Sequence, residues 1–102
     1  MSAYMIVEIE VTDKEAYEKY RASAQSTLAK LGGGGRIIIR GGKDGTGATE
    51  SIEGNWLPQR FVVVEFPDIE QAKKFYYSDD YQAALKLRQA SSRSKAMFIQ
   101  GE

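Results

Sequence analysis

The sequence predicts an α+β fold whose elements follow the order β-α-β-β-α-β. Segments in which apolar residues alternate lie at both ends and in the middle of the chain, which is typical of half-buried strands. Two segments with apolar residues three and four positions apart separate them, as in amphipathic helices. The 102 residues suit a single domain over 1–102, with one modest core.

The first half of the chain predicts a strand followed by a long helix. Residues 3–11 alternate between two faces, one carrying Met5, Val7, Ile9 and Val11 and the other Tyr4, Ile6, Glu8 and Glu10. The helix is expected from Thr12 to about Leu31, with Thr12 as N-cap and Glu15 completing a capping box. We expect Gly32 to end this helix in a left-handed conformation.

The second half predicts three more strands and a second helical segment. Strands are expected over 36–40, 60–67 and 95–100, with a short pairing strand over 50–54. Helix is expected to begin after Asp68 and to restart after Ser78. This order is the split βαβ, or ferredoxin-like, pattern. Its antiparallel sheet has the strand order 4-1-3-2, with both helices on one face.

Composition limits the possible partners and cofactors. Fourteen basic residues balance fourteen acidic ones, so we expect neither nucleic acid nor an anionic membrane as partner. The chain has no cysteine and no histidine, which removes the usual metal ligands and the usual general base, and we expect no cofactor and no metal. No apolar run approaches a membrane span in length, and a cytoplasmic location is expected.

The segment from Leu31 to Gly47 holds eight of the ten glycines and raises the question of phosphate binding. A P-loop needs a glycine five residues before Gly42 and a hydroxyl after Lys43, but the sequence has Ile37 and Asp44 there. A dinucleotide-binding turn would lie between a strand and a helix, not between strands. The glycines therefore indicate turns of a long hairpin, and the role of residues 41–49 stays open.

The sheet face away from the helices is predicted to need a partner. It is expected to carry Tyr4, Ile6, Ile38, Phe61 and Val63 together with Glu8, Glu65, Arg36 and Arg40. Such an apolar patch favours a homodimer in which two sheets meet. Two interpretations of the charges stay open. They form a glutamate–arginine network at the interface, or they line a cavity where Glu65 acts as a base and Arg40 and Glu8 contact an anionic or carbonyl-bearing ligand.

Four further residues are candidates for ligand contact. Trp56 and Arg60 flank a proline at the start of a strand, where they would bracket a planar ligand unless Trp56 packs over the sheet edge. Tyr81 and Arg88 lie seven residues apart on one helical face. That spacing fits a ligand contact, or packing with a surface ion pair. Tyr17 and Tyr20 are expected in the apolar stripe of the first helix.

Several stretches together resemble the small bacterial family DUF1330, a branch of the dimeric α+β barrel superfamily. The resemblance covers nearly the whole chain and is carried by "AYMIVEIEVTDKEAYEKYR", "RGG", "EGNWLPQRFVVVEFP" and "YYSDDYQAALKLR". It implies a ferredoxin-like subunit that pairs through its sheet with a second subunit. The sequence departs from the family pattern at Phe75 (usually tryptophan), at Asp79 (usually proline) and in its longer glycine-rich hairpin.

The resemblance implies no assigned activity. Related branches of the superfamily include cofactor-independent monooxygenases, muconolactone isomerases and haem enzymes. The function predicted here is binding, or cofactor-independent transformation, of a small organic molecule in a cleft of a homodimer. The alternative is a non-catalytic dimerisation or ligand-sensing module.

Overall fold

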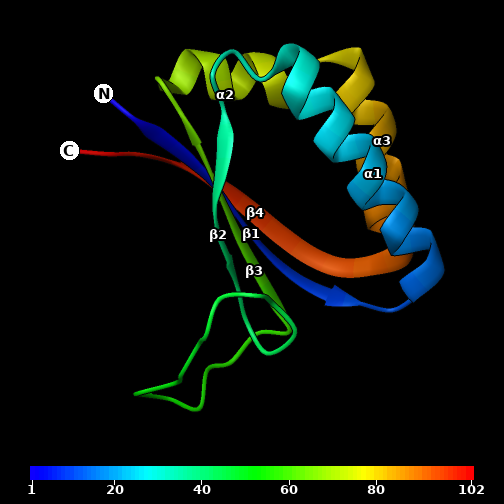
Figure 1. Ribbon diagram of the computed structural model, residues 1–102, viewed down its shortest axis with the longest axis vertical. Coiled ribbons are helices and arrows are strands. Elements are labelled where there is room, and N and C mark those ends of the chain that lie inside the picture. Colours follow the sequence, from blue (N-terminus) through cyan, green and yellow to red (C-terminus); the bar gives the residue numbers. More distant parts are fainter.

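The computed structural model describes the whole chain, residues 1–102, and confirms the predicted α+β fold. The strands are β1 (Ala3–Val11), β2 (Arg36–Gly41), β3 (Arg60–Phe66) and β4 (Ser92–Gln100). The helices are α1 (Lys14–Leu31), α2 (Ile69–Tyr76) and α3 (Asp79–Ser91). The strands form one sheet in the order β2-β3-β1-β4, and every neighbouring pair is antiparallel. All three helices cover one face of this sheet, and the other face is open (Figure 1).

The core lies between the sheet and the helices. Met5, Val7 and Ile9 of β1 are at most 4% exposed, which confirms that this alternating set faces the helices. On β3 the corresponding residues are Val64 and Phe66, and the helices contribute Phe75 and Tyr81 among others. Phe66, Phe75 and Tyr81 stack in sequence, with ring centroids 5.6 and 4.7 Å apart. None of the helices is long and apolar enough to cross a membrane.

The helix boundaries differ from the prediction at both ends of α1. Asp13, not Thr12, is the N-cap, because the Asp13 carboxylate accepts a hydrogen bond from the backbone N–H of Ala16. The N–H of Thr12 instead donates to the carbonyl of Ser91. At the other end Gly32 has a right-handed conformation, and the left-handed positions fall on Gly33 and Gly34. The predicted caps Asp68 and Ser78 are confirmed.

The long connection between β2 and β3 contains no strand, contrary to the expectation for 50–54. It extends away from the body of the molecule (Figure 1). The base of this connection is held by hydrogen bonds from the N–H groups of Lys43 and Asp44 to the carbonyls of Pro58 and Gln59. These backbone bonds fix where residues 44–46 lie relative to the sheet.

A β-bulge in β2 changes which side chains share a face. Arg36 lies opposite Glu65 and Ile37 opposite Val64, but the next pair is Ile39 with Val63. The extra residue, Ile38, shifts the alternation by one position, so every later side chain turns to the other face. Ile39 therefore lies on the open face with Val63, and Arg40 lies opposite Val62 on the helix-covered face. This corrects the prediction that Arg40 shares the open face with Glu65.

Candidate functional site

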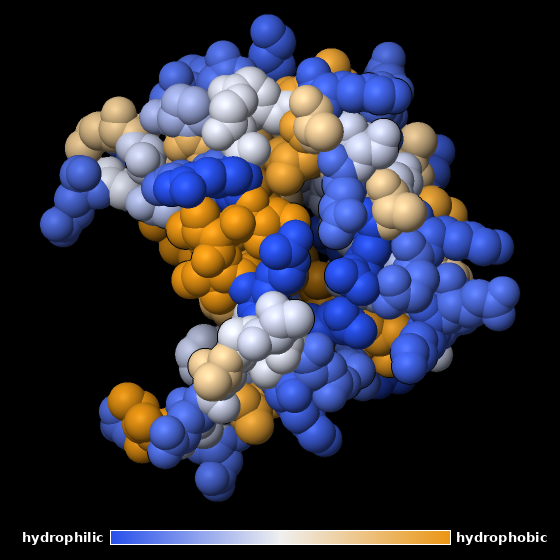
Figure 2. Space-filling view, viewed as in Figure 1, coloured by the Kyte–Doolittle hydropathy of each residue, from blue (hydrophilic) through white to orange (hydrophobic).

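A pocket of about 300 Å³ lies between α1 and the helix-covered face of β1, β2 and β3. Its walls are mostly apolar and come from the sheet, α1 and Phe75. Asp44, Gly45 and Thr46 contribute to its lining from the base of the long connection. Figure 2 shows a hollow between α1 and β2 with hydrophobic atoms inside it and hydrophilic residues around it. We call this space the helix–sheet pocket.

The charged residues of the pocket are mainly arginines without carboxylate partners. Arg40 and Arg60 line it, and neither forms an ion pair. The guanidinium of Arg60 lies over the ring of Tyr17, 5.2 Å from its centroid, and its buried Nε has no hydrogen-bond partner. The third lining arginine, Arg21, is paired with Glu18 at 3.0 Å. The pocket is therefore electropositive around an apolar interior.

Asp44 is the one carboxylate that lines this pocket. Its Oδ2 accepts a hydrogen bond of 2.8 Å from Nε2 of Gln59. The amide oxygen of the same glutamine accepts from the backbone N–H of Val11 at 2.7 Å. Gln59 thereby ties the carboxylate to the end of β1. Asp44 therefore lines the same pocket as the two unpaired arginines.

Two tyrosines of the pocket wall are hydrogen-bonded to a buried arginine, Arg88, that does not line the pocket. The hydroxyls of Tyr20 and Tyr81 are 2.8 Å apart, and Nη1 of Arg88 donates to them at 3.5 and 3.1 Å respectively. Both tyrosines line the pocket. Burial raises the pKa of Tyr81 well above its usual value, so its phenol stays protonated. Arg88 is 3% exposed and has no carboxylate partner.

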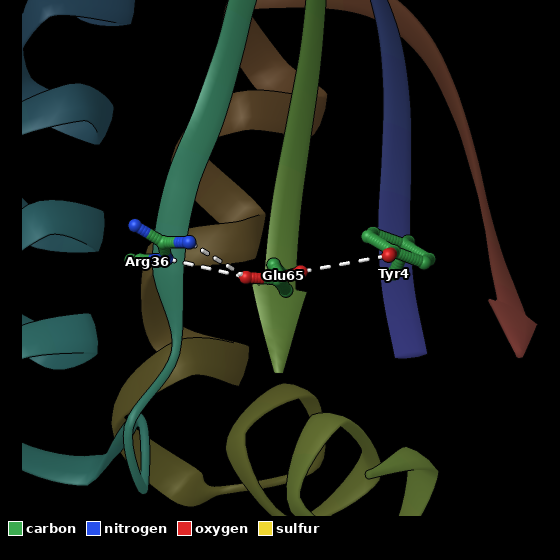
Figure 3. Close-up of polar contacts among 3 residues, drawn as sticks. All are labelled: Tyr4, Arg36 and Glu65. Carbon is green, nitrogen blue, oxygen red and sulfur yellow. Dashed lines mark hydrogen bonds and ion pairs between the residues drawn. The ribbon is translucent and has the colours of Figure 1, made fainter. Parts of the chain in front are cut away.

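Glu65 belongs to the open face and not to this pocket. Nε and Nη2 of Arg36 donate to its Oε1 at 3.2 and 3.1 Å, and the hydroxyl of Tyr4 donates to its Oε2 at 3.5 Å. Figure 3 shows the three side chains side by side on neighbouring strands. Of the predicted glutamate–arginine network, the structure pairs Glu65 with Arg36, while Arg40 lies on the other face of the sheet.

Glu8 and Trp56 also lie on the open face. The indole N–H of Trp56 donates to Glu8 at 2.9 Å, and the ammonium of Lys95 lies 3.4 Å from the same carboxylate. The hydrogen bond from Trp56, followed by the contact with Lys95, lowers the pKa of Glu8 below its usual value. The Trp56 ring packs edge-on against Phe61. Trp56 and Arg60 therefore lie on opposite faces and do not bracket one ligand within a subunit.

The candidate residues thus separate into two groups. One group lies at or behind the helix–sheet pocket and consists of Arg40, Arg60, Tyr81 and Arg88. The other group lies on the open face and consists of Glu8, Glu65 and Trp56. Tyr17 and Tyr20 also line the pocket, although their spacing indicated only a core stripe. The tyrosines themselves could have indicated a polar site, because a helical stripe of tyrosines buries hydroxyl groups that require hydrogen-bond partners. Arg88 is buried and bonded to phenols, and does not form the surface ion pair considered from its spacing.

The fold and the pocket define a ferredoxin-like α+β protein with a cavity between its helices and its sheet. Residues 2–102 match the family described as a domain of unknown function, DUF1330. The chain belongs to this family. Among curated proteins, none matches the chain.

Three solved structures illustrate the similarity of the fold. A protein of unknown function from Rhodopseudomonas palustris, RPA0582, is 17% identical with a TM-score of 0.75, over 99% of this chain and 82% of its own. A dimeric ferredoxin-like protein of unknown function from Jannaschia sp. CCS1 is 14% identical with a TM-score of 0.73, over 99% and 100%. SnoaB, a cofactor-independent oxygenase from Streptomyces nogalater, is 11% identical with a TM-score of 0.67, over 99% and 93%.

Proposed function

We propose that this chain binds a small organic anion in the helix–sheet pocket. The observation that carries the proposal is the presence of Arg40 and Arg60, without ion-pair partners, in an otherwise mostly apolar pocket of about 300 Å³. Ligand sites in proteins are typically apolar cavities of roughly this size or larger with a few convergent polar groups. The apolar walls would hold the body of the ligand, and the arginines its negative group.

Arginine suits the recognition of a carboxylate because its planar guanidinium donates two parallel hydrogen bonds. The guanidinium of Arg60 lies over the ring of Tyr17, 5.2 Å from its centroid, and this cation–π contact uses none of its N–H donors. Its Nε is buried and closed to solvent, so a bound carboxylate would accept from the terminal nitrogens of the Arg60 guanidinium. The proposed ligand is therefore an organic acid with an apolar or aromatic body.

A calorimetric comparison of benzoate with benzamide tests the proposal, because these probes share a shape but differ in charge. We expect benzoate to bind more tightly and the substitution Arg60→Met to weaken it about tenfold, as loss of a charged hydrogen bond implies. Arg93→Met is the matched control, since Arg93 lies outside the pocket and pairs with Glu10. Equal binding of the two probes, or no effect of Arg60→Met, would contradict the proposal.

A second candidate function is cofactor-independent transformation of the bound molecule. The pocket places a carboxylate acceptor, Asp44, and phenolic donors in one cavity, which is the combination that proton transfer needs. The similar fold of SnoaB, a cofactor-independent oxygenase, supports the idea that such a subunit can carry chemistry. Screening quinols, lactones and enolisable carbonyls for turnover separates an enzyme from a ligand-sensing module. Loss of any activity in Asp44→Asn would assign the base.

We also propose that two copies of the chain associate through their open sheet faces. Hydrophobic side chains gather beside β2 on the side of the sheet away from the helices (Figure 2). Ile39, Met97 and Ile99 are 46%, 60% and 41% exposed on that face. Exposed apolar patches of this kind mark interfaces. A second copy would cover them and would leave both helix–sheet pockets open on the outer sides.

A further inference from the structure

The buried group formed by Tyr20, Tyr81 and Arg88 contains more hydrogen-bond donors than acceptors. The two phenols carry two hydroxyl hydrogens, and their mutual hydrogen bond uses one of them, whichever oxygen donates. Both oxygens accept from Nη1 of Arg88, so neither phenol finds an acceptor in the guanidinium. One hydroxyl hydrogen is therefore left without an acceptor in the protein.

Arg88 adds to this excess of donors. Its side chain is 3% exposed, its Nε has no hydrogen-bond partner, and no carboxylate lies within ion-pair distance. A buried cation without a counter-charge is costly, and proteins normally pair such groups. The guanidinium also lies over the ring of Tyr20, 5.7 Å from its centroid. What this cluster lacks is an oxygen that carries negative charge.

We propose that the Tyr20–Tyr81–Arg88 cluster binds a negatively charged oxygen of the ligand, a phenolate or an enolate, at the inner end of the helix–sheet pocket. This inference rests on the proposed function and names its substrate class. The ligand would carry a carboxylate for Arg40 and Arg60 and an ionisable hydroxyl or carbonyl oxygen for the cluster. Hydroxyaromatic acids and enolisable oxo acids have these two groups.

The tyrosines that line the pocket indicate the length of the proposed ligand. The guanidinium of Arg60 lies over Tyr17, Tyr17 contacts Tyr20 with centroids 5.5 Å apart, and Tyr20 contacts Tyr81 at 6.5 Å. Arg88 lies over the middle ring, that of Tyr20, and donates to the hydroxyls of Tyr20 and Tyr81. A ligand with its carboxylate at Arg60 and its second oxygen at these two hydroxyls would lie along the tyrosines.

The ionisation of the cluster fits the role of a donor site. Burial raises the pKa of Tyr81, and the neighbouring Tyr20 raises it further, while Arg88 opposes this rise. The phenol of Tyr81 therefore stays neutral at physiological pH and can donate a hydrogen bond. Burial by itself disfavours the charged form of Arg88, but the tyrosine oxygens outweigh it and the pKa of Arg88 rises. Donors fixed in advance around an oxyanion are the arrangement that stabilises negative charge most strongly.

A coloured probe, para-hydroxy-meta-nitrobenzoate, tests the inference because its phenolate absorbs visible light and its ionisation can be read directly. We expect the phenol of the bound probe to have a pKa about one unit below that of the free probe, a tenfold shift in its ionisation constant. Tyr81→Phe and Tyr20→Phe should each return the bound value toward the free one. Tyr77→Phe, which removes a hydroxyl from an exposed tyrosine, should leave it unchanged.

Each possible result decides between the two proposals. A probe that binds, loses affinity in Arg60→Met, and keeps its free pKa would overturn this inference and leave the proposed function standing. A lowered pKa that neither Tyr20→Phe nor Tyr81→Phe alters would also overturn it, since the charge would then lie elsewhere. A raised pKa of the bound phenol would overturn it as well, because the site would then favour the neutral phenol over the phenolate. Failure of both the probe and benzoate to bind would overturn the proposed function and this inference together.

Discussion

Glu65 illustrates how one side chain supports two interpretations until its neighbours are known. Its carboxylate accepts from Arg36 through two nitrogens and from Tyr4, and its side chain is 25% exposed. Arg36 is 74% exposed, so water screens this pair strongly. The pair therefore stabilises the subunit modestly and orients two side chains on the face proposed for dimerisation.

We expect Glu65→Gln to destabilise the protein by about 0.5–1 kcal/mol, because it weakens a charged hydrogen bond between partly exposed groups. Urea unfolding of Glu65→Gln, Arg36→Met and the double variant should show non-additive losses. Glu10→Gln is the control, since Glu10 and Arg93 are both largely exposed. A stabilised Glu65→Gln would instead indicate a carboxylate kept for function.

Glu8 makes the stability of the protein depend on pH. Its pKa is lowered below the ordinary value of 4.5 by the indole hydrogen bond of Trp56. A lowered folded-state pKa contributes stability that is present above 4.5 and is lost as the pH falls through the folded value. We expect Glu8→Gln to reduce the steepness of acid destabilisation. Thermal melts of both proteins at pH values above and below 4.5 measure this pH dependence. The single tryptophan, Trp56, reports its contact with Glu8 by fluorescence. A fluorescence spectrum that does not change with acidification in the folded protein would count against this expectation.

At the level of elements, β2 decides the composition of the pocket. The bulge at Ile38 turns Arg40 toward the helices, and the turn that follows brings Asp44 into the lining of the same pocket. Gly42 makes that turn possible, because its φ of +97° lies in the left-handed region and a Cβ there would lie 2.6 Å from the carbonyl of Gln59.

We expect Gly42→Ala to destabilise the protein by about 1 kcal/mol or more beyond Gly54→Ala. Gly54 is a matched control, since its φ is +74° but a Cβ there would meet nothing within 4 Å. Both variants carry the backbone strain, and only the first adds a clash with the backbone at residues 58–60. Urea unfolding measures the difference. Equal stabilities would show that the backbone at the base of the connection shifts to accommodate the added Cβ. That result would contradict the expectation that the hydrogen bonds of Lys43 and Asp44 hold this backbone in place.

At the level of the whole molecule, the one-sided covering of the sheet is the dominant feature. The helices cover one face, and the other keeps exposed apolar residues such as Met97 and Ile39 beside the ion pairs of Glu8 and Glu65. An isologous contact between two such faces would bury the apolar residues and allow the charges to pair across a two-fold axis.

We expect a dimer of twice 11.4 kDa in sedimentation equilibrium at micromolar concentration. Its interface should bury at least roughly 1,200 Å² in total, the lower limit of stable interfaces. Met97→Asp should shift the equilibrium to the monomer, because it places a charge in the apolar patch. Leu87→Asp is the control, as Leu87 is 39% exposed on α3. A wild-type protein that remains a monomer would refute sheet-to-sheet association.

Most of the fold could be predicted from the sequence because its signals are local. Alternation over 3–11 and 60–66 identifies β1, β3 and their buried faces, and the caps Asp68 and Ser78 mark helix starts through their own side chains. The β-α-β-β-α-β order then leaves few ways to pair the strands. The errors at Thr12 and Gly32 are shifts of one residue, where neighbouring side chains compete for the same role.

The candidate site depended on information that is not local. Alternation assigned Arg40 to the open face, and one inserted residue in β2 reversed that assignment, because a strand repeats every two residues. From the sequence alone, Arg88 fits a surface cation. In the folded chain it contacts Tyr20 of α1, which is 68 residues away, and Tyr81 of α3, which is 7 residues away. Sequence periodicity specifies which faces are apolar, and so determines the elements and the layers. Which polar groups meet in a cavity is set by register and packing between distant segments, and those are properties of the folded chain.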